Sequence, residues 1–206
     1  WENYADQGGG VYLDETSAIS FSQGYLVANM ASEGAGFEVD GGTLALVNVA
    51  SRFNEATDEG GGLLLIDASA DVINTSFVND DATTGGNIYA SGSSILELTN
   101  SIVAYSPATG VMVDGSGAFT GSYNDVYGNI GGQYSGITDP TGSSGNISAA
   151  PSFTAFSDDG VHTNDDLHLQ ASSPCVNTGN PSGSYYDANG TRNDMGAFGG
   201  PGSDWD

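Results

Sequence analysis

Residues 62–65 read Gly-Leu-Leu-Leu, and this pattern of a turn residue followed by three strand-forming residues recurs along the first half of the chain. The equivalent stretches begin at Gly10, Gly36, Gly62, Asn87 and Gly110, so the steps between them are 26, 26, 25 and 23 residues. Short β-rich runs at such a period, without helical periodicity, are typical of a solenoid whose repeat is one turn of backbone. The spacing predicts an all-β fold, a parallel β-helix.

A second series, of asparagines that each close a β-rich stretch, has nearly the same period. Its members are Asn48, Asn74, Asn100 and Asn124, with steps of 26, 26 and 24 residues. Equivalent positions in a coil of parallel strands stack at about 4.8 Å, so we expect a structural ladder in which side-chain amides bond along the column. Asparagine also tolerates the left-handed backbone of a sharp corner. The alternative is four unrelated turn asparagines.

The composition favours one elongated domain. The chain has 32 glycines among 206 residues, yet 38% of it is hydrophobic, with 10 Tyr and 8 Phe. This is too much core material for a disordered chain and indicates frequent turns. We predict about seven turns in a single domain over residues 1–206: regular turns at 1–132, irregular turns with loops at 133–198, and a tail at 199–206. No apolar stretch is long enough to cross a bilayer and no signal segment is recognised, so we expect a mature piece without membrane insertion.

The charge of the chain restricts its partners. Two basic and 26 acidic residues give a formal net charge of -24. Nucleic acid is excluded as a partner because that affinity comes mainly from Lys and Arg, and acidic polysaccharides and anionic membranes are disfavoured. The charge favours a saline or calcium-containing extracellular setting, secreted or at the cell surface, although it is also compatible with a merely soluble acidic surface. Cys175 is the single cysteine, which excludes an intrachain disulfide and favours a buried hydrophobic role.

Several later segments carry a family resemblance. Besides the glycine-led repeats, they read Tyr-Asn-Asp-Val-Tyr-Gly-Asn at 123–129, Asn-Ile-Ser-Ala-Ala-Pro-Ser-Phe at 146–153 and Asp-Met-Gly-Ala-Phe-Gly-Gly at 194–200. Together they resemble the C-terminal half of bacterial secreted right-handed parallel β-helix proteins of the pectate-lyase-like superfamily. The Gly-Gly repeats also resemble those of polymorphic outer-membrane proteins. The resemblance implies a right-handed parallel β-helix, but this architecture includes lyases, hydrolases, adhesins and structural proteins.

The alignment of the repeats predicts an incomplete first turn. Matching Gly8 to Gly34 places Trp1 opposite Val27, so the chain starts partway round a coil. An uncovered solenoid end exposes unpaired backbone groups and an apolar cross-section. Either a longer protein or another copy would supply the missing strands.

From this we hypothesise a structural or adhesive surface protein that associates head-to-tail into a filament, as a homo-oligomer or homopolymer. The proposed subunit contact consists of Trp1 and Tyr4 at one end, and Phe198 and Trp205 at the other. A heterologous contact of this kind does not close, and so produces a filament. The alternative is that Trp205 folds back on its own surface.

The competing class is a carbohydrate-active enzyme, or a domain that binds neutral polysaccharide through Tyr and Trp. Hydrolases need paired carboxylates, and acidic doublets occur at residues 80–81, 158–159 and 165–166, the last flanked by His162 and His168. In a chain this acidic, such doublets are expected without catalysis. A lyase acting on acidic sugars needs basic residues, and only Arg52 and Arg192 are present. We therefore predict no catalytic residues and no enzyme activity.

A metal site is suggested by one loop, Asp-Ala-Asn-Gly-Thr-Arg-Asn-Asp at 187–194. Its opening resembles a calcium loop, in which oxygens at alternate positions converge. The candidate ligands are Asp187, Asn189, Asn193 and Asp194. The closing Glu of an EF-hand is missing, and Arg192 could neutralise the carboxylates and leave an ordinary turn. Calcium is the one cofactor that the sequence suggests.

Overall fold

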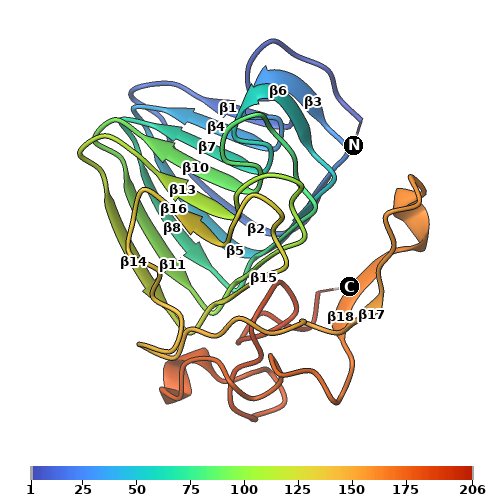
Figure 1. The fold of residues 1–206 in the computed structure, drawn as a ribbon. Coiled ribbons are helices and arrows are strands. Elements are labelled where there is room, and N and C mark those ends of the chain that lie inside the picture. The colour runs from blue at the N-terminus through green and yellow to red at the C-terminus, as the bar shows by residue number, and fades with distance from the viewer. Residues whose placement is uncertain (1, 206) are drawn as a thin grey trace.

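The computed structural model describes residues 2–205 as a coil of parallel strands with a C-terminal segment along its side (Figure 1). The chain is all-β, with about five turns in the coil and 3% helix. The first sheet contains β1 (Val11–Leu13), β4 (Phe37–Asp40), β7 (Leu63–Ile66), β10 (Ile88–Ser91), β13 (Val111–Val113) and β16 (Tyr134–Ser135).

The second sheet contributes two strand segments to each turn. In the first two turns these segments form one continuous strand, β2 (Ala18–Val27) or β5 (Thr43–Arg52). Later turns divide it into β8 (Ser69–Ile73) and β9 (Ser76–Val78), β11 (Ile95–Thr99) and β12 (Ile102–Ala104), and β14 (Ala118–Ser122) and β15 (Asp125–Tyr127). A third side is formed by β3 (Met30–Glu33) and β6 (Glu55–Glu59).

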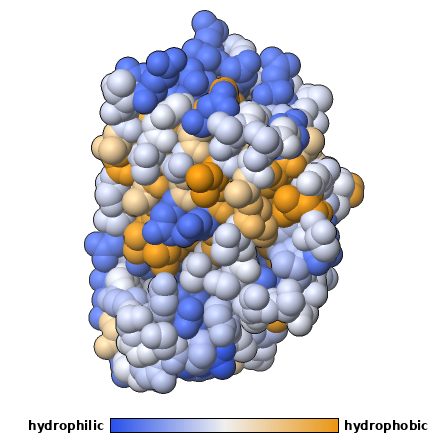
Figure 2. Space-filling model, turned by 90° about the vertical axis from the view of Figure 1, so that its left-hand side faces the viewer, coloured by the Kyte–Doolittle hydropathy of each residue, from blue (hydrophilic) through white to orange (hydrophobic). Residues whose placement is uncertain are grey.

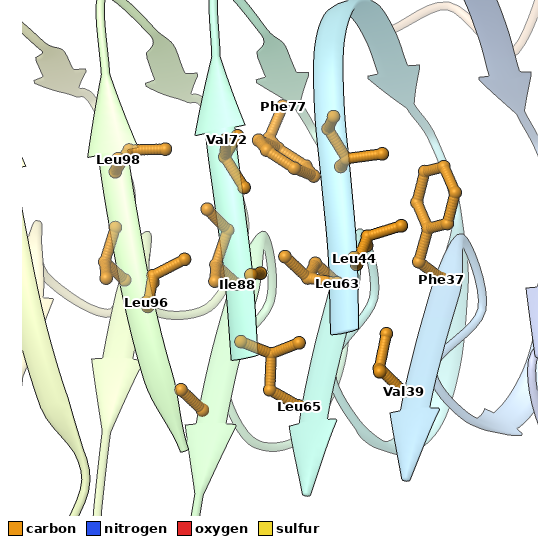
Figure 3. Close-up of a cluster of buried hydrophobic side chains, with 14 of the residues drawn as sticks. Phe37, Val39, Leu44, Leu63, Leu65, Val72, Phe77, Ile88, Leu96 and Leu98 are labelled. Carbon is orange, nitrogen blue, oxygen red and sulfur yellow. The ribbon is translucent and has the colours of Figure 1, made fainter. Parts of the chain in front are cut away.

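The core lies between the two large sheets. The strands pair in parallel and in register, so Val11, Phe37, Leu63, Ile88 and Val111 share one column. Figure 3 shows such side chains from both sheets pointing at one another, and the members labelled there are fully buried. Alternate residues of each strand face this core because the side-chain period of a strand is two. The predicted repeat is thus one turn of backbone.

The glycine period has a steric cause at the corner before the first sheet. Gly34 and Gly60 have φ values of 57° and 63°, in the left-handed region. A Cβ on Gly34 would lie 2.4 Å from the Cβ of Glu38, and one on Gly60 would lie 2.6 Å from that of Leu64. Glycine is therefore needed for both the backbone conformation and the space.

The predicted seven turns were too many, because the chain leaves the coil after its last layer. β16 and the bridge between Asp125 and Ile147 are the final additions to the coil. Residues 148–205, here called the C-terminal flank, instead run back along the side of the coil and include the antiparallel pair β17 (Phe153–Ala155) and β18 (Asp166–Leu169). Two short 3-10 helices, η1 (His162–Asn164) and η2 (Gly183–Tyr185), also lie in this segment.

The flank has its own hydrophobic core against the outside of the second sheet. On the coil this core uses outward-facing residues such as Val78, Ile102 and Ala104, and on the flank Leu167 and Met195, all buried. Cys175 is fully buried in the same cluster, as predicted, and its thiol also donates to Oδ2 of the buried Asp125 at 3.1 Å. Burial on this second face explains why an irregular segment with few strands is ordered.

No helix in the described part of the chain is both long and apolar enough to cross a membrane.

Candidate functional site

The asparagine column predicted from the sequence forms a corner of the coil, but its amides do not bond along the column. Asn48, Asn74 and Asn100 have φ values of 56°, 45° and 53°, as a sharp corner requires. The Nδ2 of Asn48 donates to the carbonyls of Ala197 and Gly199, at 2.8 and 2.7 Å. These side chains therefore hold the flank, which corrects the predicted ladder.

The same is true of the next two members of this column. Asn74 and Asn193 exchange amide hydrogen bonds, the one from Nδ2 of Asn193 to Oδ1 of Asn74 being 3.1 Å long. The Oδ1 of Asn100 accepts from the backbone N–H of Asn180 at 2.7 Å. A column of corner asparagines is thus the main polar attachment of the flank.

Asn124 lies one position away from this column, in the adjacent buried one. The residue that shares the left-handed corner with Asn100 is Tyr123, with φ of 55°. Asn124 accepts from the backbone N–H of Ser101 at 2.9 Å and donates through Nδ2 to Oδ1 of Asn146 at 3.1 Å. Only this fourth residue bonds to an amide of the next layer, as the predicted ladder requires.

The longest side-chain ladder is one that the sequence reasoning missed. It connects Asn3, Asn29, Asn54 and Asp80, with Nδ2-to-Oδ1 distances of 2.9, 2.8 and 2.8 Å between successive residues. Asn29, Asn54 and Asp80 are fully buried. The steps of 26, 25 and 26 residues match the coil period, so the signal was present in the sequence.

Burial raises the pKa of Asp80 to about 7, against the opposing hydrogen bonds from Asn54 and Ser51 and the charge of Arg52. The ladder therefore ends, at its fourth member, in a carboxyl group whose protonation depends on pH near neutrality.

Arg52, the basic residue within the repeats, is covered by the flank. It is 5% exposed and shares an outward column with Val27 and Val78. Its guanidinium donates to the carbonyl of His162 at 3.1 Å, and its Cζ lies 5.5 Å from the ring centroid of Tyr25. Burial lowers the pKa of Arg52, although nearby carboxylates oppose this shift. This charge holds the flank on the coil and is not presented to an anionic sugar.

The acidic doublet at 165–166 makes bonds within the flank. Asp165 accepts from the backbone N–H of Ser157 at 2.9 Å. Oδ1 of Asp166 lies 2.6 Å from Nδ1 of His168, whose ring stacks on Phe198 at 3.8 Å. Partial burial would raise the pKa of Asp166, but the hydrogen bonds from His168 outweigh it and lower the pKa. The pair therefore packs the flank on Phe198.

The remaining doublets bind neighbouring chain segments. Asp80 belongs to the buried ladder, whereas Asp158 accepts from Nδ2 of Asn79 at 3.0 Å. His162 stacks near Phe53, with ring centroids 4.5 Å apart. These contacts attach β17, β18 and the connection between them to the second and third turns of the coil.

The predicted calcium loop is closed by hydrogen bonds from its own chain. Oδ1 of Asp187 accepts from the N–H groups of Asp194 and Gly200, at 3.1 and 2.6 Å, and Oδ2 accepts from the hydroxyl of Thr191. Arg192 donates to the carbonyls of Thr178 and Gly179, at 3.0 and 2.7 Å, and so bonds the loop to the preceding segment of the flank. Across residues 2–205, no three acidic, His or Cys side chains are grouped so as to hold a metal ion.

Two other candidate ligands of that loop have structural bonds as well. Asn189 accepts through Oδ1 from the N–H and the hydroxyl of Thr191, at 2.8 and 2.6 Å. Asp194 accepts from the N–H of Asn177 at 2.6 Å. With Asn193 paired to Asn74, the loop fastens the flank to the corner column.

The proposed subunit contact is not supported by the positions of its members. Phe198 and Trp205 stack on each other with ring centroids 4.9 Å apart, and Trp205 also packs on Tyr25 in the first turn. The indole Nε1 donates to the carbonyl of Ala197 at 2.9 Å. Trp205 therefore folds back on its own surface, which is the alternative reading. Tyr4 is 81% exposed at the first turn, and Trp1 lies outside the described residues.

Two clefts lie where the flank meets the coil. One, of about 340 Å³, is lined by Phe53, His162 and several acidic residues, including Glu55 and Asp158. The other, of about 370 Å³, lies over the middle of β2 and β5 and the end of β8 and has an uncharged lining, with Tyr185 of η2 on its flank side.

The charge of -24 does not make the whole surface hydrophilic. Figure 2 shows the left side of Figure 1, where β8, β11 and β14 are labelled, with a band of hydrophobic side chains between hydrophilic regions. Ile95, at the start of β11, is 47% exposed.

No protein-family model, curated protein or solved structure shows a significant match to this chain. The parallel β-helix is therefore established by its geometry, while membership of the pectate-lyase-like superfamily stays a prediction.

Proposed function

We propose that the chain is an extracellular structural or adhesive subunit whose coil is continued by another copy at its first turn. The observation that supports this is an open edge. β1 pairs with β4 and β2 pairs with β5, and among the described residues no strand pairs with the other edge of β1 or β2. Such an edge is a template for another strand.

The side chains of this first turn support the same proposal. Ile19 occupies the inward column of Leu44, yet it is 41% exposed, whereas Leu44 is fully buried. Phe21 and Val11, also inward, are half-buried. A further coil layer would remove this apolar surface from water, which stabilises the contact by about 25 cal/mol for each Å² buried.

The opposite end of the coil offers a matching surface. Phe119 shares the column of Ile19, and Gly121 shares the column of Phe21. Phe119 and Tyr134 are half-buried, with ring centroids 6.1 Å apart. Stacked copies would therefore bring the apolar side chains Ile19 and Phe21 of one end against Phe119 of the other. Because the two ends differ, the contact is heterologous and would build an open filament.

This contact replaces the one predicted through Phe198 and Trp205. The net charge of -24 opposes association of identical chains, so we expect assembly to strengthen with salt or divalent cations. The acidic surface also supports an extracellular site of action.

The test compares two isoleucines of similar exposure. Ile19→Lys places a charge in the open interior of the first turn, whereas Ile95→Lys places one on the outer face. Sedimentation and negative-stain microscopy at high protein and salt concentration should show filaments for the wild type and Ile95→Lys, and single particles for Ile19→Lys. A circular dichroism melt verifies that both variants are folded. Dispersed wild-type particles with salt and calcium present would contradict the proposal.

We further propose that the protein is not an enzyme, because the candidate carboxylates bond within the chain. A panel of neutral and acidic polysaccharides, with and without a chelator, tests this. Turnover that disappears in Asp165→Asn or Asp166→Asn would overturn it.

A further inference from the structure

We propose that the uncharged cleft between η2 and the second sheet binds a neutral saccharide. The cleft has a volume of about 370 Å³, within the range of small-molecule sites. It lies at a seam between two separately packed cores, the coil interior and the flank, and ligand sites occur preferentially at such junctions. This site is independent of the assembly proposed above.

The floor of the cleft is a flat surface of stacked strands. Ser22, Val47 and Ile73 occupy one outward column of β2, β5 and β8. Adjacent members of this column are about 4.8 Å apart. Two aliphatic side chains and one hydroxyl therefore form a shallow apolar strip with a polar end. A pyranose ring has the same combination, an apolar C–H face with hydroxyls at its edge.

The wall is contributed by the flank and is held in place. Tyr185 and Ser184 of η2 line this side of the cleft. The carbonyl of Tyr185 accepts from Nδ2 of Asn193 at 2.8 Å, and Asn193 is paired with Asn74 of the coil. The backbone of Tyr185 is thus held in place before a ligand arrives, which reduces the entropy lost on ordering this segment.

The hydrogen-bonding groups that surround this apolar surface are all uncharged. Besides the hydroxyls of Ser22 and Ser184, Gln23 offers its side-chain amide, whose Nε2 donates weakly to the carbonyl of Gly202 at 3.3 Å. No acidic or basic residue lines the cleft, in a chain with 26 acidic residues. A cationic ligand would therefore find no counter-charge, and the net charge of -24 repels an anionic one. Neutral sugars fit both conditions.

The experiment uses the full chain labelled with 15N and titrated with neutral sugars. Glucose, galactose, mannose and cellobiose are added at millimolar concentrations, with galacturonic acid and glucosamine as charged comparisons. Chemical-shift changes should cluster at Tyr185, Gln23 and Ile73 for a neutral sugar. No response to any neutral sugar, a stronger response to a charged one, or shifts located elsewhere would overturn the proposal.

A matched pair of variants tests the aromatic wall. Tyr185→Ala should lower the association constant of the most tightly bound neutral sugar by about tenfold, which corresponds to the loss of one aromatic contact. Tyr185→Phe keeps the ring and should bind within a few-fold of the wild type. Tyr186 is 39% exposed and does not line the cleft, so Tyr186→Ala should bind normally. Equal losses in the two alanine variants, with folding verified by their spectra, would contradict the assignment.

Discussion

The buried ladder of amides predicts a large loss of stability when Asn54 is replaced. Its Oδ1 accepts from the N–H and Nδ2 of Asn29, at 3.0 and 2.8 Å, and its Nδ2 donates to the carbonyl of Leu26, to Ser51 and to Asp80. Asn54→Ala leaves at least the N–H of Asn29 and the carbonyl of Leu26 buried without these partners. Each unsatisfied group costs about 1–3 kcal/mol, so we expect a loss of about 4 kcal/mol.

In a chain of this size each kcal/mol lowers Tm by about 2–4 °C, so the expected shift is about 8–16 °C. Thermal melts and urea unfolding followed by circular dichroism measure it. Asn54→Leu keeps the branching and the number of side-chain heavy atoms but loses the polar groups, and should be destabilised as well. The control is Asn164→Ala, which removes one exposed hydrogen bond to Asp159 and should change stability by less than about 0.5 kcal/mol. If both Asn54 variants have the same Tm as the Asn164→Ala control, the ladder does not stabilise the coil.

Three further predictions concern pH, the acidic loop and the flank. Burial raises the pKa of Glu38 to about 7, with a hydrogen bond from Gly8 opposing it, so its protonated form stabilises the fold below about pH 4.5 and this contribution is lost as pH rises through 7. The free energy of unfolding in urea should be lower at pH 8 than at pH 5, and this decline should be smaller in Glu38→Gln than in the wild type. An equal decline in both proteins would contradict the raised pKa of Glu38. Asp187→Ala removes three internal hydrogen bonds and should lower the free energy of unfolding by about 2–4 kcal/mol. The loss should be the same with a chelator and with calcium. A calcium-dependent rise in Tm that occurs only in the wild type would instead identify a metal site. Trp205→Ala should destabilise the packing of the flank by about 2 kcal/mol. Proteolysis of residues 148–205 should become faster while the coil stays folded. A changed oligomeric state with unchanged proteolysis would refute the assignment of Trp205 to the flank.

The coil could be predicted from the sequence because its period has a local steric cause. Glycine is required at positions 34 and 60 because the backbone there is left-handed and a Cβ would collide with the side chain four residues later. Such glycines therefore mark each turn. The register at Asn124 was wrong by one position because the later turn is shorter: Asn100 aligns with Tyr123, a step of 23 residues, where the earlier steps are 26. A period measured over long turns does not locate a residue in a short one.

The position of the flank could not be predicted from its own residues. It has few strands, and the surface that it covers belongs to the coil. A signal was nevertheless present there, because residues 102–104, Ile-Val-Ala, are apolar and buried on both faces of β12. Strands that are apolar on both faces are covered on both. The corner asparagines bond laterally for the same reason, since a second segment lies against them.

The most direct measurement of the proposed assembly is a cysteine cross-link between its two ends. Ser20 in the first turn and Thr120 in the last share one outward column, and both are exposed. If copies stack in register, these residues meet across the contact at the spacing of adjacent strands, about 4.8 Å, which a disulfide can bridge.

The native Cys175 is fully buried and does not compete. Under mild oxidation, the double variant Ser20→Cys/Thr120→Cys should give a series of covalent multimers on a non-reducing gel, while each single variant stays monomeric. A double variant that stays monomeric, or Ser20→Cys alone forming dimers through two first turns, would contradict head-to-tail continuation of the coil.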